Sequence, residues 1–226
     1  MSRYENSLST QQSVPTISRR AYNLLTYGLV TVSFLITWGM YGFVNGGGLS
    51  RALGGVNPLL LLVAYLAGTI GGFVLMGIGK SKQSVAVSLV GYAIFTATFG
   101  GTLALLLTRY NVGTIYYAFA ITACISGIFL ILGVMFPEFF AAIGRILFAS
   151  LLAIIVVELV ATIFFHADQT IFDYIVVLLF CGFLGYDSYL MSSDAPTVPN
   201  SIFYASEIYI DIVNILVRVL DIMDNK

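Results

Sequence analysis

The sequence predicts an all-α membrane protein with seven transmembrane helices. Charged residues make up 9% of the 226 residues, against about 25% in an ordinary soluble domain. The mean hydropathy is +0.96 and 59% of the residues are hydrophobic, so lipid must be the solvent for most of the chain. The third observation is segment length, because seven apolar segments reach the roughly 20 residues that a membrane-spanning helix needs.

Prolines and short connections separate the seven predicted spans. Proline cannot donate a hydrogen bond within a helix, and each proline of this chain falls between or before the apolar segments. Short connections make neighbouring helices antiparallel, so residues 21–226 are expected to form a single seven-helix domain. The predicted spans are residues 22–44, 58–79, 85–108, 114–135, 141–165, 171–191 and 201–223.

The remaining composition limits the partners of the chain. Residues 1–20 are polar and lack an apolar signal-peptide core, so they predict a flexible N-terminal tail. The net charge is −1 and no run of Lys or Arg is present, which points to the lipid bilayer as the partner and away from nucleic acid. Cys124 and Cys181 lie alone in apolar stretches and are expected to be packing residues. No cofactor is expected.

The basic residues predict a cytoplasmic N-terminus, because cytoplasmic loops carry an excess of Lys and Arg. With that orientation, the inner segments hold Arg3, Arg19, Arg20, Lys80, Lys82 and Arg145. The outer segments hold Arg51, Arg109, Arg218 and Lys226. A location in a bacterial inner membrane is the expectation for such a chain.

Small residues recur at helix-packing spacing in the second and third spans. Gly68 and Gly72 form one such pair, and Ala97 and Gly101 form another. Pairs of this kind let two helix backbones approach closely within lipid. They are therefore interpreted as packing positions.

Two aspartates in the last two spans are the candidate functional residues. Asp187 lies in the sixth span and Asp211 in the seventh. A charged side chain at the centre of a bilayer helix costs roughly 2.5–3.5 kcal/mol, and such acids usually face a bundle interior or a water-filled path. Counted from the turn between the two spans, their depths differ by about 6 Å, so the two side chains can meet.

The last span also carries a narrow polar stripe. Its polar residues follow steps of 3, 4, 3, 4 and 3, which places them on one helical face. A helix of this kind belongs in the interior of a bundle, whereas an interfacial amphipathic helix would carry several Lys or Arg. The stripe consists of Tyr204, Glu207, Asp211, Asn214, Arg218 and Asp221.

These residues resemble the Bax inhibitor-1 family, also called the transmembrane Bax inhibitor motif family. The similarity is carried by Tyr186-Asp187 in the sixth span and by residues 205–214 in the seventh, which resemble the family's Ser/Leu-Tyr-x-Asp-x-x-Asn helix. Residues 95–100 resemble its Phe-Thr-x-x-x-Gly pattern. The resemblance implies six helices around a central C-terminal helix and a calcium leak that responds to pH, as in the bacterial members of this type.

The resemblance also implies roles for single residues. Asp187 and Asp211 would share a proton, act as the pH sensor and bind Ca²⁺ transiently as the permeant ion. A basic residue near the end of the second span, Lys80 or Lys82 here, would pair with the sensor. Apart from the resemblance, the stripe residues Glu207, Asn214 and Arg218 are candidates to line the pore or to contact the gate, and Glu158 is a further acid that could line the path.

The functional hypothesis is a pH-dependent cation leak and not an enzyme. Two carboxylates held close in a poorly hydrated place cannot easily both ionise, so they titrate as a unit. One alternative is a non-transporting regulator that binds a membrane protease or another membrane protein. A remoter alternative is an intramembrane aspartyl protease, but Tyr209-Ile210 precede Asp211 where that class has Gly-x-Gly.

Overall fold

The structure is a computed structural model that describes residues 15–48, 51, 55–165 and 170–224. Most of the predicted N-terminal tail, residues 1–14, lies outside the described residues. In the described part of the chain the secondary structure is helical, and six of the seven long helices are long and apolar enough to cross a membrane, all except the last. The helices are α1 (Arg19–Asn45), α3 (Pro58–Lys82), α4 (Val85–Leu107), α5 (Val112–Met135), α6 (Pro137–Phe165), α7 (Thr170–Ser193) and α8 (Val198–Asp224).

Helix ends extend past the predicted apolar spans because polar residues cap them. Ser18 accepts a hydrogen bond from the backbone N–H of Ala21 at the start of α1, and Asn111 does the same for Thr114 in α5. Such caps satisfy backbone donors that have no partner within the helix. Pro58 and Pro137 are the first residues of their helices, where the missing N–H leaves no hydrogen bond unmade.

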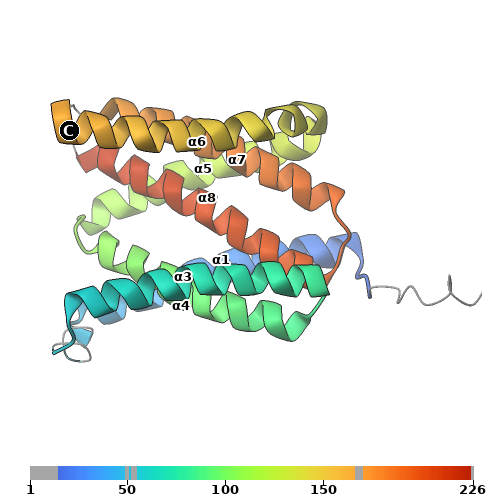
Figure 1. Ribbon diagram of the computed structural model, residues 1–226, viewed down its shortest axis with the longest axis horizontal. Helices are drawn as coiled ribbons and strands as arrows, with labels where there is room; N and C mark the ends of the chain where they lie inside the picture. The colour runs from blue at the N-terminus through green and yellow to red at the C-terminus, as the bar shows by residue number, and fades with distance from the viewer. Residues whose placement is uncertain (1–14, 49–50, 52–54, 166–169, 225–226) are drawn as a thin grey trace, which may run out of the picture.

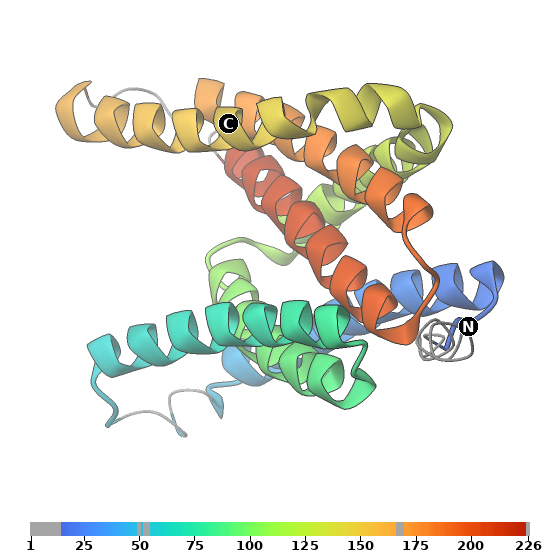
Figure 2. The ribbon, with the colours of Figure 1, turned by 45° about the vertical axis from the view of Figure 1, so that its right-hand side comes forward.

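Helix α8 lies between two groups of three helices (Figures 1 and 2). On one side α4 packs against α1 and α3, and on the other side α7 packs against α5 and α6. Both groups reach α8, which contacts α1, α3, α4, α5 and α7 directly. The largest share of the buried core therefore comes from α8, whose side chains are buried along its whole length.

Close backbone contacts hold each group together. A Cβ on Gly72 of α3 would lie 2.7 Å from the backbone nitrogen of Phe95 and 2.8 Å from the carbonyl oxygen of Gly91, both in α4. In the other group Gly133 of α5 lies directly against the Gly185 carbonyl of α7. The prediction that Gly72 is a packing position is confirmed, because any side chain there would collide with backbone.

The two ends of the bundle differ in what they carry. The backbone N–H of Ile17 donates to the carbonyl oxygen of Pro196 at 2.8 Å, so the start of α1 and the α7–α8 turn share one end. We call this end the N-terminal face, and the end where α8 finishes the C-terminal face. Successive helices run in opposite directions between the two faces (Figure 1).

Candidate functional site

Asp187, in the last third of α7, and Asp211, near the middle of α8, meet in the interior. The side chains are nearly inaccessible, with 8% and 5% of their residue surface exposed, respectively. Their carboxyl groups lie within hydrogen-bonding reach of each other. A carboxylate can only accept hydrogen bonds, so one member of the pair must carry a proton for this bond to form. The two carboxyl groups thus bring α7 and α8 together at this point.

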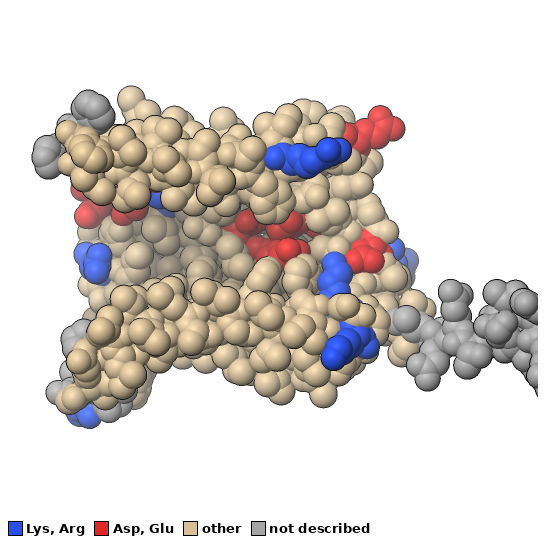
Figure 3. Space-filling model, viewed as in Figure 1, with Lys and Arg blue, Asp and Glu red and all other residues tan. Residues whose placement is uncertain are grey.

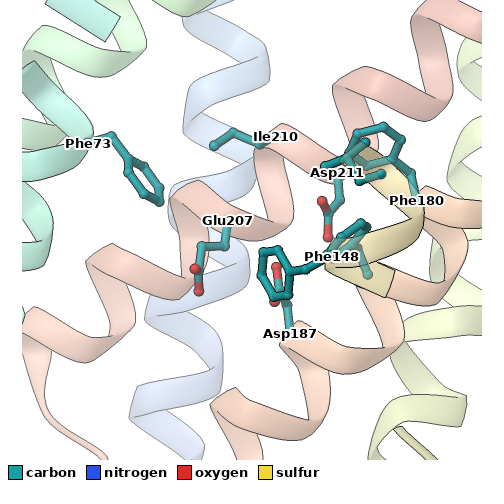
Figure 4. Close-up of a pocket in the computed structure, with 9 residues that line it drawn as sticks. Phe73, Phe148, Phe180, Asp187, Glu207, Ile210 and Asp211 are labelled. Atoms are coloured by element: carbon teal, nitrogen blue, oxygen red, sulfur yellow. The ribbon is translucent and has the colours of Figure 1, made fainter. Parts of the chain in front are cut away.

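The pair lines a cavity of about 160 Å³, which also contains a third acid, Glu207. Glu207 stands one turn before Asp211 on α8, while Asp187 enters from α7 (Figure 4). Within the described structure, Oε2 of Glu207 and Oδ2 of Asp211 are buried without a hydrogen-bond partner. The rest of the wall is apolar: Phe73, Phe148, Leu151, Phe180, Phe183 and Ile210.

The acidic cavity reaches the side of the molecule. Figure 3 shows acidic side chains at the bottom of a groove whose two edges are α6 and α3. These two helices belong to different groups, and neither packs closely on the other. In a membrane this groove would face the lipid rather than either aqueous side.

A second charged cluster lies on the N-terminal face. The ammonium of Lys80 pairs with Asp194 Oδ2 at 3.0 Å and donates to the hydroxyl of Tyr204 at 2.8 Å. The Tyr204 hydroxyl in turn donates to the same Asp194 oxygen at 2.9 Å. Burial alone would raise the pKa of Asp194, but the hydrogen bonds from Lys80, the Ala195 N–H and Tyr204 outweigh it and hold that pKa below 3.8.

A third cluster lies toward the C-terminal face. The guanidinium of Arg218 donates to Glu158 of α6 at 2.9 and 3.2 Å and to Asp173 of α7 at 2.8 Å. This arrangement joins three helices, and the Asp173 side chain is 1% exposed. The nearby Tyr110 hydroxyl donates to Asp221 at 2.5 Å, which ties the α4–α5 connection to α8.

The predicted site residues therefore separate into three places. Asp187, Asp211 and Glu207 come together at the cavity, whereas Lys80 lies with Asp194 and Arg218 lies with two acids of other helices. Lys82 is exposed at the end of α3. Asn214 donates to the Ile210 carbonyl of its own helix at 2.8 Å and lines a different cavity, of about 380 Å³, between α4 and α8.

The sequence did not identify Asp173 as a partner of Arg218, or Asp194 as a partner of Lys80. One signal was available for Asp173: an arginine in an apolar helix must find an acid at its own depth, because an unpaired buried charge is costly. Asp194 follows the sixth predicted span, and no sequence signal links it to Lys80 in the second span. Of the described residues, no three His, Cys, Asp or Glu side chains are grouped closely enough to hold a metal ion.

Fold and site together define a class: a polytopic helical membrane protein whose last two helices meet through a buried pair of carboxyl groups. The family model described as "Inhibitor of apoptosis-promoting Bax1" matches residues 14–226. The chain belongs to this Bax inhibitor-1 family. It is an integral membrane protein, and its family is not a known class of enzymes.

Two similar proteins illustrate the range of the family. The chain is 24% identical to the inner membrane protein YbhL of Escherichia coli (strain K12) over the full length of both chains. It is 25% identical to the Golgi anti-apoptotic protein of Vaccinia virus (strain Lister), over 91% of this chain and 86% of the viral protein. No solved structure shows a significant match.

Proposed function

We propose that this protein is a pH-dependent cation leak that conducts Ca²⁺ and is gated by the proton shared between Asp187 and Asp211. The single observation that carries the proposal is that these two buried carboxyl groups, from different helices, meet at one cavity. The proposal treats α8 as the seventh transmembrane helix and as the centre of the bundle. Its contacts with five other helices support this placement.

The proton acts as a link between two helices. With the proton present, the pair forms a hydrogen bond and holds α7 against α8. Without it, two carboxylates about 4 Å apart would repel each other by about 4 kcal/mol at the effective dielectric constant of protein sites. Such a change is large enough to shift a two-state equilibrium by several hundred-fold, so loss of the proton would favour an arrangement with the helices separated.

Separation would also create an attractive site for a cation. Ca²⁺ binds carboxylate and carbonyl oxygens, and the deprotonated pair with Glu207 would offer such oxygens at the cavity. The cavity that Asn214 lines begins on α8 at Val213, two residues beyond Asp211, a rise of about 3 Å. The two cavities therefore lie next to each other along α8, and a shift of this helix would connect them.

Calcium flux into liposomes, measured between pH 5 and 8, tests the proposal. Wild-type protein should show a flux that changes with pH, and Asp187→Asn or Asp211→Asn should flatten that profile because the pair no longer titrates. Asp194→Asn is the matched control, since it removes one carboxylate from α7's end but leaves the pair intact. An unchanged profile in both pair variants would exclude the gate, and absence of wild-type flux at every pH would favour a non-transporting regulator.

A further inference from the structure

We propose that the cavity at Asp187, Glu207 and Asp211 is also a binding site for small organic ammonium ions that enter from the lipid side. Such a ligand has a positively charged nitrogen and an apolar body. The proposal goes beyond the leak, because it concerns occupancy of the cavity and not passage through it.

The wall of the cavity fits the apolar body. Four phenylalanines line it, Phe73 from α3, Phe148 from α6, and Phe180 and Phe183 from α7. Aromatic faces attract cations, and the attraction is strongest where water is excluded. The volume of about 160 Å³ is close to that of an apolar cavity of about 150 Å³ known to hold benzene. A body of one six-membered ring therefore matches the space.

The acids fit the charged end. Asp187 and Asp211 keep one negative charge between them while they share a proton, and Glu207 adds a third carboxyl group. One oxygen of Asp211 and one of Glu207 are buried without a hydrogen-bond partner in the described part of the chain. An ammonium ion has N–H donors to offer to both oxygens, and buried polar atoms of this kind are normally satisfied.

The neighbouring basic residue leaves the acids free for a ligand. Lys80 acts electrostatically on Asp187 and Glu207, but its ammonium is occupied by Asp194 at 3.0 Å and by the Tyr204 hydroxyl at 2.8 Å. The same ammonium lies 4.7 Å from the ring centroid of Phe203 and 3.9 Å from that of Tyr204. This protein thus already holds one alkylammonium group with a carboxylate and two aromatic rings.

A bare metal ion fits this cavity less well than an organic ammonium ion does. Ca²⁺ takes 6–8 oxygen ligands, whereas most of this wall is aromatic or aliphatic. The acids of the described residues do not gather into a metal-binding group. Calcium can therefore pass the acids, but an organic ammonium ion gains contacts from the whole wall. The groove between α6 and α3 (Figure 3) opens to the region where amphiphilic amines dissolve in a bilayer.

Equilibrium dialysis of radiolabelled benzylammonium against the full-length protein in lipid nanodiscs tests this site at neutral pH, with empty nanodiscs as the blank. We expect saturable binding of one ligand per protein. Cyclohexylmethylammonium should displace it, whereas benzyl alcohol, which has the same ring without the charge, should not. Binding is read without ion flux, so this proposal and the leak can fail independently.

Two pairs of variants locate the ligand. Glu207→Gln keeps the shape of the side chain and should weaken binding at least tenfold, while Glu138→Gln, an exposed acid at the start of α6, should not. Phe148 is 60% exposed, so Phe148→Leu should fold and weaken binding several-fold; Phe164→Leu, exposed elsewhere on α6, should have no effect. Binding no greater than to empty nanodiscs, equal displacement by benzyl alcohol, or full affinity in Glu207→Gln and Phe148→Leu would each overturn the proposal.

Discussion

Two aspartates near the end of α7 have opposite surroundings, although only seven positions separate them. Asp187 is buried against another acid, whereas Asp194 accepts hydrogen bonds from Lys80, Tyr204 and a backbone N–H. The first arrangement needs a proton to be stable, and the second needs its absence. Of these two aspartates, only Asp187 belongs to the carboxyl pair on which the proposed gate depends.

Asp194 supplies a prediction at the scale of single residues. Its folded pKa lies below the ordinary value of 3.8, so the fold favours the ionised form. The stability that it contributes is complete above pH 4 and is lost only as the pH falls through the lower folded value. Asp194→Asn should lower the free energy of unfolding by about 1 kcal/mol, as expected for a partly exposed ion pair, and by the same amount at every pH from 5 to 8.

Unfolding in mixed detergent micelles, followed by circular dichroism at several pH values, measures this effect. Lys80→Met should cost at least as much, because it removes the same pair and also the contacts of Lys80 with Phe203 and Tyr204. A loss that grows or disappears between pH 5 and 8 would show that Asp194 titrates in that range, contrary to this account.

Adjacent glycines in α3 provide a prediction at the scale of helices. A Cβ on Gly72 would collide with the backbone of α4, whereas a Cβ on Gly71 meets nothing within 4 Å. Gly72→Ala should therefore destabilise the protein by about 1–3 kcal/mol, the usual cost of overpacking. Gly71→Ala should be neutral or stabilise it by about 0.5–1 kcal/mol, since alanine favours the helix. The same unfolding measurement compares the two, and equal effects would contradict close packing of α3 on α4.

The cluster around Arg218 predicts how α6, α7 and α8 depend on one another. Arg218→Met leaves the carboxyl group of Asp173 buried without its partner, which should cost about 3 kcal/mol. Adding Asp173→Leu should recover most of that loss, because apolar replacements of a buried ion pair are often neutral. Arg109→Met, at an exposed position in the α4–α5 connection, is the control and should change the free energy of unfolding by less than about 0.5 kcal/mol. If the double variant is no more stable than Arg218→Met alone, the unpaired carboxyl group of Asp173 is not the cause of the lost stability.

The elements could be predicted from the sequence more completely than the site. Apolar segment length and proline position set the helices, and the structure adds mainly polar caps such as Ser18 and Asn111. Spacing also places the polar residues of α8 on one face. It does not show which helix meets each of them, because that depends on depth and neighbours. Arg218, seven residues from Asp211, lies about 10 Å further along α8 and therefore meets a different set of acids.

At the scale of the whole molecule, α8 combines a polar composition with a buried position. Its polar stripe makes it too charged to qualify as a membrane span by hydropathy, yet it is the helix most surrounded by others. Charges that would be costly in lipid are instead paired within the protein, as Arg218 is with Glu158 and Asp173. The six apolar helices thus provide the environment in which a polar helix can cross the bundle.

This arrangement predicts that the two chain ends lie on opposite sides of the membrane. Helix α1 starts at the N-terminal face, and α8 ends at the C-terminal face (Figure 1). The excess of Lys and Arg predicts that the N-terminal face is cytoplasmic. A green fluorescent protein fused to the N-terminus should be fluorescent in bacterial cells, and alkaline phosphatase fused to the C-terminus should be active. In the reciprocal fusions, phosphatase before residue 1 should be inactive, and fluorescent protein after residue 226 should not fluoresce. A fluorescent C-terminal fusion together with a fluorescent N-terminal fusion would mean that α8 does not cross, and the ion path along α8 would then have no exit on the far side.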